Sequence, residues 1–312
     1  MTSLVFPGQG SQYIGMGKEF YEKFQEVKDV FEEAEKVTDI PVKKLCFEGP
    51  LSELTKTENL QVCLTTVNIA CFLGLRLTSQ GKLGVKFVAG HSLGEYSALF
   101  VAGVLSLEDT LRAVKLRGKL MGKAGGKEPS GMYAVIGMPL PELEALVQQA
   151  EDLVIVSNYN SPKQLVISGR EPACGKVAEA CKKRGARVVK LKVSAAFHSP
   201  LMEEAQKEFS EFLETLTWKK PVIPFVSNVT GNGVTSAEEI KSLMKKQITS
   251  PVKWIDCVNY IYYEGCKTFV EVGPKRVLSG LISQILEGKD FKVFNVEKPE
   301  DAEKLLTCLP YN

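Results

Sequence analysis

The chain has 312 residues, enough for one large domain or about two of ordinary size, so we expect a sizeable hydrophobic core. Its 39 Lys and Arg residues nearly balance 37 Asp and Glu residues, and the net charge of +2 argues against a protein that binds nucleic acid over its whole surface. Hydrophobic residues make up 44% and charged residues 24%, close to the globular average, which excludes disordered, collagen-like and membrane-bundle proteins.

The cysteines and the apolar segments indicate a cytoplasmic protein. The eight cysteines form no C-x-x-C pair and no metal-ligand spacing, so we predict buried thiols in a reducing compartment. The N-terminus lacks the basic and apolar regions of a secretory signal. The longest uncharged run, residues 59–75, contains Asn, Gln and Thr and is shorter than the ~20 apolar residues of a membrane span. This run therefore predicts no transmembrane helix and no membrane association. Because His91 and His198 are the only histidines, we predict no multi-histidine metal centre.

The first predicted strand, Leu4-Val5-Phe6, leads into a glycine-rich loop at residues 7–12. A dinucleotide-binding loop would need glycine where Tyr13 stands, and a P-loop would need lysine where Met16 stands. We therefore interpret the loop as a tight turn whose backbone, or whose Gln9 side chain, lines a pocket.

The next predicted elements are helices at residues 19–38 and 59–80, a strand at 85–89 and a helix at 95–102. A further helix begins at Ser106, with Asp109 placed for a capping arrangement. Arg117 lies near the edge of the apolar face of this helix, so we expect a cation at the boundary between core and solvent.

Turn-forming residues at 125–131 indicate a domain crossing. The following segment shows the βαββαβ order of a ferredoxin-like unit, with elements at 132–136, 141–150, 154–158, 164–169, 172–184 and 187–191. Helices and strands then alternate again, at 201–216, 223–226, 237–246, 253–262, 268–272 and 277–286. The sequence predicts an α/β fold in which a ferredoxin-like subdomain, residues 127–193, is inserted into a larger domain formed by residues 1–126 and 194–312.

Gly90-x-Ser92-x-Gly94 matches the nucleophile elbow, a sharp turn that exposes a serine hydroxyl and requires small flanking residues. The serine stands where an alternating strand ends and a helix begins, as the elbow geometry requires. The alternative is a structural turn with no chemical role. We predict that Ser92 is a nucleophile.

A serine hydroxyl needs a base, and His198 is the candidate. His91 adjoins Ser92 on the elbow strand, and because consecutive strand side chains point to opposite faces, its ring is poorly placed to reach the hydroxyl. Many acids lie between Ser92 and His198, and the pattern selects none of them as a third member. A Ser-His dyad oriented by a backbone carbonyl stays open.

Several blocks along the whole chain are similar to malonyl-CoA:acyl-carrier-protein transacylases of fatty acid and polyketide synthesis. The blocks are Phe6-Pro7-Gly8-Gln9-Gly10-Ser11-Gln12, Gly90-His91-Ser92-Leu93-Gly94-Glu95-Tyr96-Ser97-Ala98, Arg117, Asn160-Ser161-Pro162, Phe197-His198-Ser199, and Gln247 ahead of Pro251-Val252. The resemblance implies an α/β-hydrolase-like large domain with the ferredoxin-like insertion.

The resemblance also implies roles for individual residues. Ser92 would attack the malonyl thioester with His198 as base, and the backbone N–H groups of Gln9 and Leu93 would form the oxyanion hole. Arg117 would hold the malonyl carboxylate in a two-pronged pair. The remaining substrate-site residues that the resemblance implies are Phe197, Gln247, His91 and Asn160. The backbone carbonyl of Gln247 would orient His198, and Phe197 would favour malonyl over methylmalonyl.

The resemblance implies malonyl-CoA as acyl donor, the phosphopantetheine thiol of an acyl carrier protein as acceptor, no permanently bound cofactor, and a monomer. Two alternatives stay open: a proofreading thioesterase that uses the same serine, and a non-catalytic module that only binds carrier protein. Carrier proteins are usually acidic, so two basic groups are candidate docking sites. These are Lys182-Lys183-Arg184 with Arg187, Lys190 and Lys192, and Lys275-Arg276.

Overall fold

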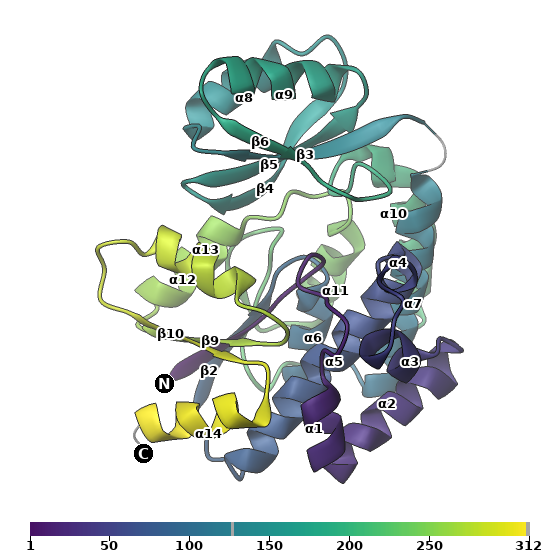
Figure 1. The fold of residues 1–312 in the computed structure, drawn as a ribbon, viewed down its shortest axis with the longest axis vertical. Coiled ribbons are helices and arrows are strands. Elements are labelled where there is room, and N and C mark those ends of the chain that lie inside the picture. Colours follow the sequence, from purple (N-terminus) through teal and green to yellow (C-terminus); the bar gives the residue numbers. More distant parts are fainter. Residues whose placement is uncertain (126–127, 310–312) are drawn as a thin grey trace.

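The computed structural model describes residues 1–125 and 128–309. It has a mixed α/β fold with two separate sheets (Figure 1). The predicted boundary between residues 126 and 127 lies outside the described residues, whereas the predicted return at residues 193 and 194 lies in the irregular segment after the second sheet.

The first sheet has six strands in the order β10-β9-β1-β2-β7-β8. Neighbouring strands are parallel except for β8, which runs antiparallel to β7. The strand bounds are β1 Thr2–Phe6, β2 Val85–Gly90, β7 Phe225–Val226, β8 Gly233–Val234, β9 Thr268–Val272 and β10 Lys292–Val296. Because β1 and β2 are parallel neighbours, their carboxyl ends open at the same edge of the sheet, where ligands usually bind in such folds.

Side chains of β1 alternate between two hydrophobic cores, one on each face of the sheet. Leu4 and Phe6 pack in a core that includes residues of α5 (Thr57–Thr78) and α6 (Gly94–Val101), whereas Val5 packs in a core that includes residues of α12 (Trp254–Tyr263) and α13 (Val277–Ile285). A strand covered on both faces has a continuous apolar sequence, as Leu4-Val5-Phe6 does. The buried strand that the sequence predicts here is confirmed.

The helices that surround this sheet lie on both sides of it (Figure 1). Their bounds are α1 Lys18–Lys23, α2 Gln25–Thr38, α3 Val42–Phe47, α4 Leu51–Leu54, α5 Thr57–Thr78, α6 Gly94–Val101, α7 Leu107–Ala124, α10 Glu203–Glu214, α11 Ala237–Lys246, α12 Trp254–Tyr263, α13 Val277–Ile285 and α14 Pro299–Cys308. The single helix predicted at 19–38 is wrong, because Phe24 is extended (φ −126°, ψ 132°) and divides it into α1 and α2. No glycine or proline marks this break, so the helical periodicity of apolar residues continues through it and predicts one helix.

Helix α5 is long and apolar enough to cross a membrane, with a mean hydropathy of 1.6 in its most apolar window. However, 78% of that window is buried inside the protein, as in a core helix. It contacts α2, α6 and α7, so its apolar surface is covered by the chain's own helices.

The second sheet has four strands in the order β4-β5-β3-β6, and all neighbours are antiparallel. The segment runs β3 Ser130–Ile136, α8 Leu140–Gln148, β4 Val154–Ser161, β5 Gln164–Arg170, α9 Ala173–Lys183 and β6 Arg187–Lys190. Helices α8 and α9 cover the sheet face that is turned away from the rest of the molecule (Figure 1). The opposite face of the sheet therefore looks toward the carboxyl ends of β1 and β2.

The structure differs from the sequence predictions at one cysteine and at two elements near the end of the chain. Seven cysteines are buried as predicted, but Cys308 is exposed near the end of α14, a helix that the sequence analysis missed together with strand β10. None of the cysteines forms a disulfide in the described part of the chain.

Candidate active site

Ser92 stands in a sharp turn between β2 and α6. Its φ of 51° lies in the left-handed region, which is strained for a serine and typical of an elbow. A Cβ on Gly90 would lie 1.9 Å from the Gly94 carbonyl carbon, and a Cβ on Gly94 would lie 2.0 Å from the Phe6 oxygen. The small residues predicted on both sides of Ser92 are therefore required by the close approach of the backbone.

Ser92 and His198 are in direct contact. Ser92 Oγ lies 2.6 Å from His198 Nε2. His198 Nδ1 lies 3.1 Å from the Gln247 carbonyl oxygen and 3.0 Å from the Ser250 carbonyl oxygen. Because a carbonyl only accepts, Nδ1 carries the proton, and Nε2 is left with a lone pair toward the serine hydroxyl.

The environment of His198 keeps its imidazole neutral. Burial, and then the positive charge of Arg117, lower the pKa of His198 from 6.5 to about 3. The ring is only 3% exposed, and the residue has a φ of 55° that turns the chain after Phe197. The lowered pKa makes the imidazole a weaker base, but the neutral ring keeps the Nε2 lone pair aimed at the Ser92 hydroxyl, the geometry that a general base needs.

The boundary position predicted for Arg117 is wrong, because the side chain is only 1% exposed. Its Nη1 donates to Gln61 Oε1 (2.8 Å), and its Nη2 donates to Ser92 Oγ (3.2 Å). Both Nε and Nη2 donate to Gln247 Oε1, at 3.2 and 3.0 Å. The apolar face of α7 alone does not predict that Arg117 is buried, because the residues that enclose its side chain come from other elements.

Glu95 is a site residue that the sequence analysis missed as a functional group. It is fully buried in the first turn of α6, and its carboxylate accepts hydrogen bonds from the Asn228 backbone N–H and from Gln247 Nε2, both at 2.8 Å. Burial raises the pKa of Glu95 from 4.5 to about 7, while these hydrogen bonds and the charge of Arg117 lower it. Its signal in the sequence is that it is the single charged residue between Gly94 and Gly103.

Asn228 is a second residue that the sequence analysis missed. Its Oδ1 accepts from the Ser92 backbone N–H and its Nδ2 donates to the Gly90 carbonyl, both at 2.7 Å. One buried amide thus fixes the turn residue Ser92 to the end of strand β2. Asn228 follows the short strand β7, and no motif in the sequence singles it out.

The remaining predicted residues lie around Ser92. His91 Nε2 is 2.7 Å from Asn160 Oδ1, and the His91 ring packs edge-on against Trp254. The ring therefore meets Asn160 rather than the Ser92 hydroxyl, as the strand alternation predicts. Burial lowers the pKa of His91 as well, so this imidazole is also neutral. Phe197 is buried, and its carbonyl accepts from Ser168 Oγ at 2.9 Å.

A cavity of about 210 Å³ lies between the two sheets and contains all these predicted residues except Gln247 in its lining. The second sheet contributes Met132, Ala134, Asn158, Asn160, Gln164 and Val166. Gly8 and Gln9 line it from the glycine-rich loop, as predicted for a pocket-lining turn. In the described chain, the backbone N–H groups of Gln9 and Leu93 donate no hydrogen bond to the protein.

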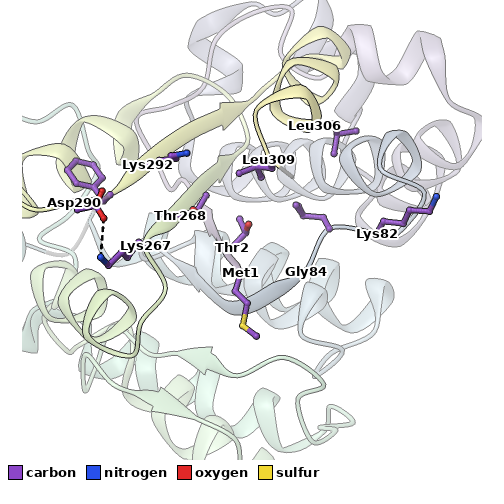
Figure 2. Close-up of a pocket in the computed structure, with 12 residues that line it drawn as sticks. Met1, Thr2, Lys82, Gly84, Lys267, Thr268, Asp290, Lys292, Leu306 and Leu309 are labelled. Carbon is purple, nitrogen blue, oxygen red and sulfur yellow. Dashed lines mark hydrogen bonds and ion pairs between the residues drawn. The ribbon is translucent and has the colours of Figure 1, made fainter. Parts of the chain in front are cut away.

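A second cavity, of about 350 Å³, opens at the other end of the first sheet (Figure 2). It is lined by the residues at which the parallel strands begin, including Thr2, Thr268 and Lys292. Its lining includes neither Ser92 nor His198. Residues 1–125 and 128–309 contain no group of three or more His, Cys, Asp or Glu side chains that could hold a metal ion.

Comparisons with known proteins agree with this geometry. The acyl transferase domain family matches residues 3–301. A malonyl CoA-acyl carrier protein transacylase of Bacillus subtilis is 38% identical over 311 residues, covering 98% of this chain and 96% of the relative. The enzyme of that name from Staphylococcus aureus is 35% identical over 306 residues, covering 97% of both chains.

Solved structures agree as well. The malonyl CoA-acyl carrier protein transacylase of Clostridium perfringens has a TM-score of 0.92 at 36% identity, covering 98% of this chain and 96% of its own. A malonyl-transacylase in complex with a type II polyketide synthase acyl-carrier protein has a TM-score of 0.93 at 34% identity, covering 99% of both chains. The chain belongs to the acyl transferase family.

Proposed function

We propose that the protein is a malonyl-CoA:acyl-carrier-protein transacylase. It transfers a malonyl group from malonyl-CoA to Ser92 and then to the phosphopantetheine thiol of an acyl carrier protein. The observation that supports this best is the buried Arg117 guanidinium 3.2 Å from Ser92 Oγ, because a carboxylate-bearing acyl group on the serine would meet a cation there. The relatives named above carry the same activity in their names.

In the first half of the reaction, His198 Nε2 takes the proton from Ser92 Oγ as the oxygen attacks the thioester carbonyl. The carbonyl oxygen becomes negative, and the free N–H groups of Gln9 and Leu93 are its donors. The carbon–sulfur bond then breaks, and the coenzyme A thiolate leaves with the proton from His198. The product is malonyl-Ser92.

The second half reverses these steps with a different thiol. His198 takes the proton from the carrier's phosphopantetheine thiol, the sulfur attacks the malonyl ester, and the proton returns to Ser92 Oγ. The Gln247 and Ser250 carbonyls keep Nδ1 protonated in both halves. No cofactor takes part in either half.

Arg117 and Phe197 select the acyl group in this proposal. The guanidinium pairs with the free malonyl carboxylate, which acetyl lacks. The buried Phe197 ring restricts the space beside C2, and such a steric effect against one extra methyl is worth about 1 to 3 kcal/mol. His91 and Asn160, joined to each other, form the part of the acyl site contributed by the elbow strand and β4.

We also propose the domain division expected from the sequence. Residues 127–193 form a ferredoxin-like subdomain, supported by the βαββαβ element order and by the strand order β4-β5-β3-β6. Residues 1–126 and 194–312 form an α/β-hydrolase-like domain, supported by the parallel sheet and by the elbow at the carboxyl end of β2. The protein acts as a cytoplasmic monomer.

The test is intact-protein mass spectrometry after brief mixing with malonyl-CoA. The parent protein should gain one malonyl group and lose it to added holo carrier protein, whereas Ser92→Ala should gain none. Release of free malonate at the same rate without carrier would favour the thioesterase alternative. Absence of any adduct would favour the non-catalytic binding module.

Three exposed cations adjoin cavity-lining residues in the chain and are the carrier docking site in this proposal. Lys192 stands between Leu191 and Val193, and Lys275-Arg276 precedes Val277, and these three apolar residues line the cavity. Lys182 and Lys190 of the other predicted group pair with Glu179 (2.6 Å) and Glu171 (3.2 Å), which reduces their free charge. Replacing Lys275 and Arg276 by Glu should raise the KM for carrier protein, while acylation by malonyl-N-acetylcysteamine stays unchanged.

A further inference from the structure

Glu95 is an unusual residue for the position that it occupies. Its side chain is fully buried directly behind the nucleophile, and no ion pair to it is found among the residues that the structure describes. A buried carboxylate without a direct cation is costly unless its oxygens accept hydrogen bonds. Each oxygen has one such donor, the Asn228 N–H for Oε1 and Gln247 Nε2 for Oε2.

The Gln247 side chain has its orientation fixed from both ends. Arg117 has only donors, so it must meet the amide oxygen, and it does so with Nε and Nη2. An ionised Glu95 only accepts, so it must meet the amide nitrogen. The same nitrogen donates to the Ser92 carbonyl at 2.8 Å. Arg117 and the carboxylate of Glu95 therefore impose the same orientation on this amide.

This arrangement separates the two buried charges by one neutral amide. A direct Arg117–Glu95 ion pair would occupy the guanidinium and compete with an incoming carboxylate. Through the amide, Arg117 is held by the neutral acceptors Gln61 and Gln247 and keeps its positive charge available beside Ser92 Oγ. The two charged residues still stabilise each other electrostatically across the amide.

We propose that Glu95 is a positioning residue for recognition of carboxylated acyl groups, acting through the Gln247 amide to hold the Arg117 guanidinium beside Ser92. The inference rests on the proposed function, since it assigns Arg117 to the malonyl carboxylate. Nothing in this role requires Glu95 to touch the substrate. Its effect should therefore appear in acyl selectivity rather than in the reactivity of the serine.

Glu95→Gln tests the proposal with almost no change in shape. The new NH₂ group must face either the Asn228 N–H or Gln247 Nε2, and a rotated Gln247 amide would present its nitrogen to Arg117. We expect acylation by malonyl-CoA to fall by about 10-fold to 100-fold, the range for losing a hydrogen bond to a charged group. Acylation of Ser92 by p-nitrophenyl acetate, which has no carboxylate, should fall by less than about 3-fold, within the range of an indirect effect.

Glu271→Gln is the matched control. Glu271 is also a fully buried glutamate with a pKa raised by burial, and its carboxylate accepts from the N–H groups of Leu278 and Ser279 on α13, away from Arg117. We expect Glu271→Gln to keep the parent's ratio of the acylation rate with malonyl-CoA to the acylation rate with p-nitrophenyl acetate. A fall of that ratio in both variants would overturn the proposal, because it would then follow from any buried Glu→Gln change.

The outcomes are separable from those of the proposed function. If the parent protein forms no malonyl adduct, the proposed function fails. If the parent does and Glu95→Gln has the same ratio, or loses both acylations equally, the positioning role fails. If Glu95→Gln does not fold, Glu95→Asp is the second variant, because it keeps the negative charge but shortens the side chain by one methylene. That variant should show the same selective loss in smaller degree, and an unchanged ratio in it would also overturn the proposal.

Discussion

Ser92 Oγ and His198 Nε2 lie 2.6 Å apart, although the two residues are 106 positions apart in the chain. The four strands of the second sheet lie in that interval, so the chain leaves the large sheet, completes a separate unit and returns to place the histidine. The pair forms only if both crossings are positioned correctly. The elbow and the returning loop are therefore the parts of the molecule in which substitutions have the sharpest consequences.

Gly90→Ala should abolish the elbow. The added Cβ would overlap the Gly94 backbone at 1.9 Å, and because backbone cannot move aside cheaply, we expect destabilisation of about 1 to 3 kcal/mol or more. Thermal unfolding and the yield of malonyl-enzyme measure both effects. Gly280→Ala is the control: it lies in α13 with no heavy atom near the added Cβ, and it should stabilise the protein by up to about 1 kcal/mol. A Gly90→Ala variant with the stability and malonyl-enzyme yield of the parent would contradict the predicted overlap with the Gly94 backbone.

Asn228→Ala should slow acylation by malonyl-CoA and by p-nitrophenyl acetate to the same degree. The variant loses both hydrogen bonds that bridge Ser92 N–H and the Gly90 carbonyl, so the strained turn is no longer held. We expect a loss of about 10-fold to 100-fold in kcat, from two hydrogen bonds at about 1 kcal/mol each. Burst kinetics with both donors check this. A loss confined to malonyl would mean that Asn228 acts on Arg117 and not on the elbow.

Arg117→Met should remove the preference for malonyl over acetyl donors. The methionine fills part of the volume but has no charge, and losing one partner of a buried charged pair costs about 2 to 5 kcal/mol. Arg117→Lys keeps the charge without the planar fork, so it should be intermediate. Rates of acyl-enzyme formation with malonyl-CoA and acetyl-CoA give the ratio. An unchanged ratio in both variants would remove Arg117 from the acyl site.

His198 should stay neutral through the physiological pH range. Its pKa is lowered to about 3 by burial and then by Arg117, so acylation should show no protonation of His198 between pH 5 and 8. Because the unfolded chain takes up a proton near pH 6.5 that the buried ring refuses, the free energy of unfolding should fall as the pH drops from about 6.5 toward 3. With only two histidines, NMR titration of the imidazoles can assign each ring.

The same titration on Arg117→Met separates the two causes. Removing the guanidinium charge should raise the pKa of His198, but burial remains and should keep it below its ordinary value. A parent His198 that titrates near 6.5 would show that water reaches the ring.

The sequence predicted those parts of the site whose signals are local. The alternation of residues 85–89, the paired glycines around Ser92 and the glycines at 8 and 10 each depend on neighbours within a few positions. The structure has the expected strand at the first place and a turn with positive φ at each of the other two. His198 was reached by elimination, because the chain has only one other histidine. A local pattern is sufficient where a short segment determines its own conformation.

Long-range packing accounts for what the sequence did not show. The apolar face of α7 alone predicts a boundary position for Arg117, whereas Gln61 and Gln247 enclose the side chain from two other segments. Asn228 and the Ser250 carbonyl act on residues more than 50 positions away, so no spacing rule could connect them. Strand β10 is partly exposed and its apolar pattern is weak, so the sequence does not predict it.

Among the described residues, those that hydrogen-bond to Ser92 or His198 lie outside the segment from β3 to β6, which lines the cavity. Reaction machinery and much of the acyl-binding surface are thus encoded by separable stretches of one polypeptide. Mutations of Gln164 and Val166, whose side chains line the cavity, can reshape the space offered to the acyl chain, whereas Ser168 of the same strand holds the Phe197 carbonyl next to His198 and is not free to change. Recombination that replaces the segment from Ser130 to Lys190 as one unit would therefore exchange much of the acyl-binding surface and keep the residues that carry out the reaction.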